Sequence, residues 1–179
     1  RTLRGRRDKV RNGGVIFGGF GPPFGYAIEN GNLVIQENHA KIIRMMFNWY
    51  TVEKITLRQI AERLTNMAIN RPGQGRLKGR KNPRSDWQSS TVRLILGNKT
   101  YAGFWTYNKT SEHEIIEVNV PAIVSLETHQ AALEQLEENK RTASRNRKYQ
   151  YLLVGHGTCA KCGATIIGRR SGKDKFTYV

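Results

Sequence analysis

The 179-residue sequence lacks any apolar run close to the roughly 18 residues that a bilayer-spanning helix needs. Its first residues, 1–14, carry charge but no apolar segment of the secretory-signal type. These absences argue against a membrane-spanning segment in this sequence and against a secretory signal in its first residues. The sequence also lacks an initial Met, so we expect it to be a fragment of something longer or a processed product.

Cysteine is scarce as well: the two cysteines, Cys159 and Cys162, form a single CxxC pair. In a reducing compartment such a pair favours metal or redox chemistry over a structural disulfide. The redox interpretation is the weaker one, because nothing before the pair resembles a thioredoxin βαβ unit.

Acidic residues are outnumbered by basic ones, with 14 Asp and Glu against 30 Lys and Arg, for a net charge of +16. Self-repulsion of this size is a liability unless a polyanion neutralises it. Nucleic acid is the commonest such partner, and a membrane surface is the alternative. The cations gather in residues 1–11, 71–84 and 140–148, whereas residues 111–138 contain seven Glu and no Lys or Arg. Separate clusters indicate several contact points along an extended polyanion, and solvated loops are the alternative.

Apolar periodicity and turn residues predict an α+β fold. Thr56 and Ser125 are placed to cap helices, and Asn30-Gly31 is placed to turn a hairpin. The expected helices cover residues 1–12, 38–53, 57–67, 89–97 and 126–143. The expected strands flank residues 29–32 and cover residues 101–108, 114–120, 151–155, 164–168 and 175–179.

Helices 57–67 and 89–97 have the size and amphipathicity of a helix-turn-helix pair, although near 20 residues connect them instead of the usual 3–4. The second helix offers Ser90 and Arg93 on its solvent face. Short polar and Arg side chains read base edges in the major groove, while cations of a basic loop hold phosphates. Two such helices are also ordinary core elements, and simple packing remains the alternative.

Aromatic residues are expected to fill the core of the first module, namely Phe47, Trp49, Tyr50, Trp87, Tyr101 and Trp105. A base-stacking surface is the alternative, with Trp105 and Tyr107 as its members. That alternative requires several aromatic rings to be exposed together on one face of a sheet.

A family resemblance is carried by several blocks in order. Residues 21–103 contain GPPFGYAIENGNLVIQENHAKIIRMMFNWY, then LRQIAERL, then Trp87 with STVRLIL, then GNKTYAG; residues 121–168 contain PAIVSLETHQAALEQL, a basic stretch and YLLVGHGTCAKCGATIIG. The first set resembles the recombinase domain of the large serine recombinases, and the second resembles the same family up to the start of its zinc ribbon. Ordered agreement over nearly the whole chain is more specific than any one block.

The resemblance implies that the chemistry lies elsewhere. The family joins mobile-element DNA by double-strand cleavage through a serine of an N-terminal catalytic domain, which would precede Arg1. We therefore expect no catalytic residue here and no enzyme activity of the fragment alone, while the parent would be a site-specific DNA recombinase. Ser89, Ser90 and Ser125 are interpreted as residues of helix starts.

The domain organisation expected from the resemblance has four parts. Residues 1–14 would end the helix from the catalytic domain, 15–141 would form the recombinase DNA-binding domain, 142–150 a basic linker that crosses the DNA backbone, and 151–179 a partial zinc ribbon. The helical module would contain the helix-turn-helix-like pair and two β-hairpins, followed by a truncated zinc-ribbon-like β module. Its partners would be double-stranded DNA and further recombinase subunits, in a dimer and a synaptic tetramer, with no membrane. A bacterial or phage-encoded protein of this kind would act in the cytoplasm, on the nucleoid.

The predicted DNA-binding residues are most of the cations of the basic clusters, three residues of helix 89–97, and Lys99. They are Arg4, Arg6, Arg7, Lys9, Arg11, Arg71, Arg76, Lys78, Arg80, Lys81, Arg84, Ser89, Ser90, Arg93, Lys99, Arg145, Arg147 and Lys148.

Zinc is expected in the full-length parent. Cys159 and Cys162 supply half of a tetrahedral site, and the second pair of ligands would lie beyond Val179. Zinc would then be absent from this fragment or incompletely coordinated. His156 could substitute as a ligand, but we interpret it as an ordinary loop residue.

Two other functions remain open at this point. A free-standing helix-turn-helix transcriptional regulator would use the same helix pair without a catalytic domain before Arg1. A basic RNA-binding module would prefer RNA hairpins over duplex DNA.

Overall fold

A computed structural model of the chain describes residues 3–17, 21–73, 86–107, 115–142, 157–170 and 176–178. The chain divides into two compact units, residues 1–136 and residues 137–179. Within the described ranges, no helix combines the length and apolarity that crossing a membrane requires.

The first unit begins with helix α1 (Leu3–Arg11) and the antiparallel hairpin of β1 (Tyr26–Glu29) and β2 (Asn32–Ile35). Asn30 and Gly31 both have positive φ, 50° and 85°, as the tight turn of a hairpin requires. Val10 at the end of α1 is 1% exposed, and Val15 just after it is 3% exposed. The end of α1 is therefore anchored in the core, and the predicted helix and hairpin are both present.

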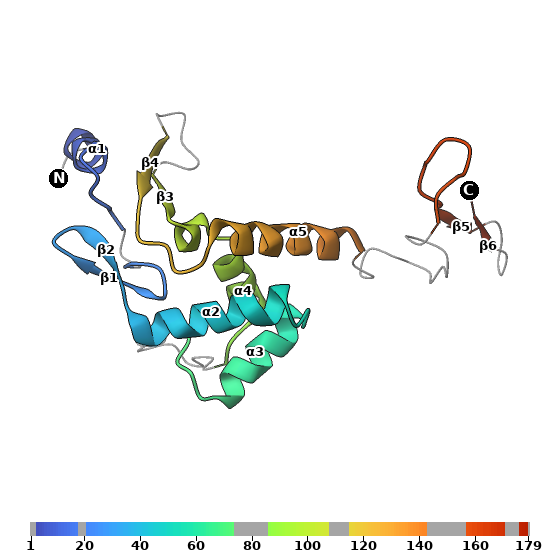
Figure 1. Ribbon diagram of the computed structural model, residues 1–179, viewed down its shortest axis with the longest axis horizontal. Coiled ribbons are helices and arrows are strands. Elements are labelled where there is room, and N and C mark those ends of the chain that lie inside the picture. Colours follow the sequence, from blue (N-terminus) through green and yellow to red (C-terminus); the bar gives the residue numbers. More distant parts are fainter. Residues whose placement is uncertain are drawn as a thin grey trace. The chain divides into compact units, whose positions relative to one another are not determined.

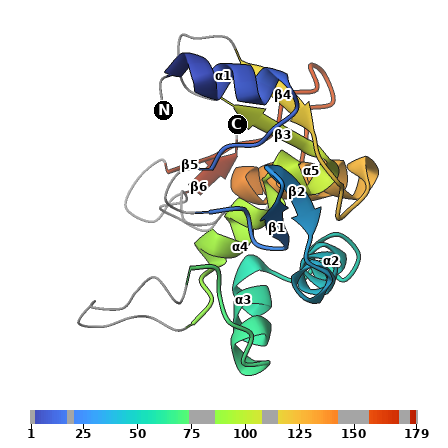
Figure 2. The ribbon, with the colours of Figure 1, turned by 90° about the vertical axis from the view of Figure 1, so that its left-hand side faces the viewer.

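Three helices of this unit pack against one another: α2 (Glu37–Thr51), α3 (Leu57–Asn66) and α4 (Ser89–Leu96) (Figures 1 and 2). The hydroxyl of Thr56 accepts from the backbone N–H of Gln59, whose side chain accepts in turn from the Thr56 N–H, so α3 starts with a complete capping box. Each helix buries its periodic apolar residues, as predicted. These include Ile43, Met46, Phe47 and Tyr50 of α2, Ile60, Ala61 and Leu64 of α3, and Val92, Ile95 and Leu96 of α4.

After α4 the chain forms a short 3-10 helix, η2 (Lys99–Ala102), then strands β3 (Phe104–Tyr107) and β4 (Ile116–Asn119) in an antiparallel hairpin. The predicted strand starting at Tyr101 is wrong at its beginning. The side chain of Asn98 caps η2 by accepting from the Thr100 N–H, and Gly103 (φ 98°) ends it. The strand therefore begins only at Phe104.

Two tyrosines join these segments in the core. The Tyr26 hydroxyl lies 2.9 Å from the Thr100 carbonyl oxygen and 2.8 Å from that of Pro121, and Tyr101 donates to the Phe24 carbonyl at 2.9 Å. Burial raises the pKa of both phenols, so they stay protonated donors. The β1–β2 hairpin, η2 and the segment before the last long helix are thereby held together.

The last long helix, α5 (Leu126–Thr142), begins where predicted, since the Ser125 hydroxyl accepts from the Thr128 N–H at 3.2 Å. The described part of the second unit contains β5 (Gly168–Arg170) paired with β6 (Phe176–Tyr178), and an isolated bridge between Thr158 and Thr165. The strand predicted at 164–168 is thus displaced, because residue 165 pairs across the CxxC turn and the ladder starts only at Gly168. The α+β class is confirmed, whereas the strand predicted at 151–155 lies outside the described residues.

Candidate nucleic-acid interface

One face of α4 is exposed, and it presents the residues that were predicted to read DNA. Ser89, Ser90 and Arg93 are exposed on this face, together with Leu94 and Gly97. They are spaced at i, i+1, i+4, i+5 and i+8, which is one continuous stripe of a helix. The opposite face is buried against α2 and α3. The helix is therefore held by its apolar side and presents a polar and basic side.

Trp87 fixes the start of α4 against the end of α3. Its indole N–H donates to the Ile69 carbonyl at 2.8 Å, and its backbone N–H donates to the Thr65 hydroxyl at 3.1 Å. The ring is 4% exposed and meets Phe24 edge-on, with centroids 5.7 Å apart. The helix pair is therefore joined directly at these two points, which explains how a connection of near 20 residues is compatible with a defined helix pair.

A groove of about 620 Å³ lies between α3 and the start of α4, and its lining includes Arg58, Glu62 and Asp86. Arg58 pairs with Glu62 at 2.9 Å. Two carboxylates make this groove a poor site for a phosphate. The exposed stripe of α4 is the better candidate for contact with a polyanion.

The cations of α1 are presented to different degrees. Arg4, Arg6 and Arg11 are exposed, whereas Arg7 and Lys9 are half-buried. The side chain of Lys9 packs over two glycines: a Cβ atom on Gly14 would lie 3.0 Å from Lys9 Cε, and one on Gly31 would lie 3.2 Å from Lys9 Nζ. Lys9 therefore helps to seat α1 on the β1–β2 hairpin, a role that its charge alone did not predict.

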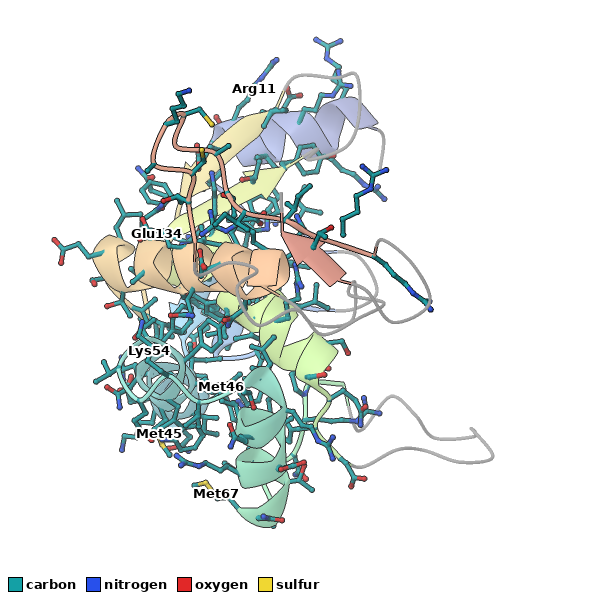
Figure 3. All side chains as sticks on the ribbon, turned by 90° about the vertical axis from the view of Figure 1, so that its right-hand side faces the viewer. Arg11, Met45, Met46, Lys54, Met67 and Glu134 are labelled. Carbon is teal, nitrogen blue, oxygen red and sulfur yellow. The ribbon has the colours of Figure 1, made fainter. Side chains whose placement is uncertain are left out.

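Within the first unit, α1 and α3 lie at opposite ends, and α4 lies between them at a distance from α1 (Figure 2). Figure 3 shows Arg11 on α1 at one end and Met67, which follows α3, at the other, and Figure 2 agrees. Two basic elements separated in this way can contact an extended polyanion at separate points.

Five ion pairs of the described residues use cations outside the individually predicted DNA-binding set. They join Arg44 to Glu37, Arg58 to Glu62, Arg63 to Glu53, Lys140 to Glu137 and Arg141 to Glu138. Arg93 and Lys99 are exposed and have no ion pair with any other described residue. Their charges therefore remain available to an external anion.

Lys99 and Arg71 are the remaining predicted DNA-binding residues that the structure describes. Lys99 begins η2, and its charge, after burial, is the second cause that lowers the pKa of the buried His129. Arg71 is half-buried, and its Nε has no hydrogen-bond partner among the described residues. Outside the described residues lie Arg76, Lys78, Arg80, Lys81, Arg84, Arg145, Arg147 and Lys148, and so does His156.

The aromatic residues serve the core as predicted, with one exception. Phe47, Tyr50, Trp87, Tyr101 and Trp105 are buried. Trp49 is only half-buried, with the Arg63 guanidinium 5.4 Å above its ring. Because Trp105 is 7% exposed and packs between Phe17 and Tyr107, the alternative of a base-stacking surface loses its main member.

Backbone hydrogen bonds order the CxxC segment and favour the thiolate form of Cys159. The Gly163 N–H donates to the Cys159 carbonyl at 2.8 Å, and the Cys159 N–H donates to the Ala164 carbonyl at 2.7 Å. Hydrogen bonds from the backbone N–H groups of Lys161 and Cys162 lower the pKa of the Cys159 thiol. Both cysteines are exposed, and among the described residues no third Cys, His or carboxylate joins them.

The main residue that sequence reasoning missed is Leu94, which is 75% exposed in the middle of the α4 stripe. A helical projection centred on Ser90 and Arg93 would have placed it there. A second missed feature is a hollow of about 470 Å³. Its lining is mostly apolar and aromatic and includes Phe17, Ile28 and Tyr107, and the two cations Arg6 and Lys9 complete it.

Comparisons with known proteins agree with this arrangement. Residues 37–139 match the family described as "Recombinase". The chain is 32% identical over 205 residues to a protein of Bacillus subtilis (strain 168) provisionally named a DNA recombinase; the match covers 99% of this chain and 39% of the relative. The chain thus spans about two fifths of the length of that relative.

Two solved structures share the fold. One is described as "Crystal Structure of a LSR-DNA Complex", with a TM-score of 0.62 and 20% identity over 98% of this chain and 51% of that one. The other is described as "Sequence Requirements of the Listeria innocua prophage attP site", with a TM-score of 0.62 and 19% identity over 98% of this chain and 69% of that one. Since the family match covers more than half of the sequence, the chain belongs to the recombinase family.

Proposed function

We propose that this chain is the DNA-recognition part of a site-specific serine recombinase and binds recombination-site duplex DNA. The observation that carries the proposal is the exposed stripe of α4, where Ser90 and Arg93 project from a helix whose other face is buried. A helix of this kind fits the major groove, and Arg is the residue that most often contacts guanine there. The DNA complex named for a structural relative supports the same assignment.

Affinity in this proposal comes mainly from phosphate contacts and specificity from α4. The exposed cations of α1 would contact the backbone at one point, and the basic clusters 71–84 and 140–148 at others. Lys140 and Arg141 already pair with Glu137 and Glu138, but exposed pairs of this type are weak and can exchange for phosphates.

The parent protein would supply what the chain does not. Strand cleavage would belong to a catalytic domain preceding Arg1, and synapsis to further subunits. Cys159 and Cys162 would supply two thiolates to a structural zinc whose other ligands lie beyond the described residues. In that site the metal would stabilise the small β module, because binding free energy of structural zinc is largely folding free energy.

The test compares discrimination between a duplex selected by this chain and a random duplex. Arg93→Ala should lower discrimination by about 1–3 kcal/mol, the contribution of a good base contact. The matched control is Arg58→Ala, which removes an equally charged, exposed side chain from α3 and should leave discrimination unchanged. Equal loss in both variants would contradict the placing of α4 as the reading element. Tighter binding to RNA hairpins would favour the RNA-binding alternative, and a parent gene without a catalytic domain before Arg1 would favour a transcriptional regulator.

A further inference from the structure

Leu94 occupies an unusual place for an exposed leucine. Single exposed leucines are ordinary on protein surfaces, so its 75% exposure alone means little. Its position is the informative feature: it lies on the same stripe of α4 as Ser90 and Arg93, one turn after Ser90. The stripe therefore combines a hydroxyl, a guanidinium and a branched apolar group.

These three groups match the three kinds of feature that base pairs display in the major groove. Hydrogen-bond acceptors and donors suit Arg93 and Ser90, and the remaining feature is the 5-methyl group of thymine, which apolar side chains contact. Gly97, the next exposed residue of the stripe, has no side chain that could keep the helix away from a groove floor. Arg93 gives the stripe a positive charge, which favours DNA over an apolar protein partner.

We infer that Leu94 is a specificity-determining residue that contacts a thymine methyl group in the bound site. The inference rests on the proposed function and names one base contact within it. Four residues of helix rise about 6 Å, and base pairs rise about 3.4 Å. The thymine should therefore lie within about two base pairs of the base that Ser90 contacts.

The experiment replaces thymines with deoxyuridine, one at a time, in a duplex that the chain selects from random sequences. This change removes only the methyl group and keeps base pairing. At one position the wild-type chain should lose about fourfold in affinity, the factor that corresponds to burying one methyl group. The Leu94→Ala chain should bind the thymine and deoxyuridine duplexes equally at that position.

The control is Leu126→Ala, which truncates a leucine of similar exposure, 59%, on α5. It should keep the fourfold response. Because Leu94 makes little packing contact, its variant should unfold at the same denaturant concentration as wild type. Failure to select any preferred duplex would overturn the proposed function itself. Selection without a thymine whose methyl response depends on Leu94 would overturn only this inference.

Discussion

The hydrogen bond from the backbone N–H of Trp87 to the Thr65 hydroxyl should contribute measurably to the free energy that holds α4 on α3. Thr65 uses its hydroxyl twice: it donates to the Ala61 carbonyl at 2.9 Å and accepts from Trp87 at 3.1 Å. Thr65→Val keeps the shape and leaves the half-buried Trp87 N–H without an acceptor. Such a loss costs about 1–3 kcal/mol of unfolding free energy.

A matched control isolates this bond. Thr51 is also half-buried near the end of a helix, and its hydroxyl donates to the Phe47 carbonyl at 2.8 Å, four residues earlier. Unlike Thr65, it accepts no hydrogen bond from another described segment. Thr51→Val therefore carries the same change in helix propensity and should cost about 0.5 kcal/mol or less.

Urea unfolding of the two variants gives the answer as a difference. We expect Thr65→Val to be less stable than Thr51→Val by about 1 kcal/mol or more, and Thr65→Ser, which keeps the hydroxyl, to stay close to wild type. Discrimination between selected and random duplexes should fall in Thr65→Val, because one of the two hydrogen bonds by which Trp87 holds the start of α4 against α3 is lost. Equal destabilisation by the two valine variants would refute the reasoning.

Three further predictions concern other parts of the chain. Lys78→Ala and Arg80→Ala should weaken binding to selected and random duplexes about equally in equilibrium titrations, because phosphate contacts carry no sequence information; a change in discrimination would contradict this. Burial and the charge of Lys99 lower the pKa of His129 in the folded chain, so the unfolded chain takes up the proton first as pH falls. The free energy of unfolding should therefore decrease as pH drops below about 6.5. His129→Gln should flatten this pH dependence in urea titrations, and an unchanged pH dependence would contradict the role of His129. A chain extended past Val179 to include a second cysteine pair should retain about one zinc by metal analysis and lose the order of its tail with a chelator, whereas tight stoichiometric zinc in the present chain would show that a local group such as His156 completes the site.

The helices could be predicted because their signals are local. The apolar spacing of α2, the capping pair Thr56 and Gln59, and the Ser125 cap all act within a few residues. The start of β3 was predicted too early because Asn98 caps η2, which precedes the strand. Tyr101 lies in η2, and its side chain packs in the core and donates to the Phe24 carbonyl.

The candidate site was predictable in part for the same reason. A helical projection places Ser90 and Arg93 on the solvent side of α4, and the structure agrees. The attachment of Trp87 to Ile69 and Thr65, and the packing of Lys9 over Gly14 and Gly31, join residues that are near only after folding. Lys9 was predicted to bind DNA from its charge, which did not reveal its packing contacts. Leu94 was missed because only polar residues of α4 were considered as DNA contacts.

The affinity of the chain for its selected duplex and for a random duplex, measured as a function of salt, tests DNA recognition most directly. The account predicts that the selected duplex binds about 10³-fold more tightly or better, and that the logarithm of affinity falls with the logarithm of salt concentration with a slope of about six or more phosphate contacts. Equal affinity for both duplexes, with a slope of only one or two contacts, would show that the basic clusters are merely solvated surface and would contradict it.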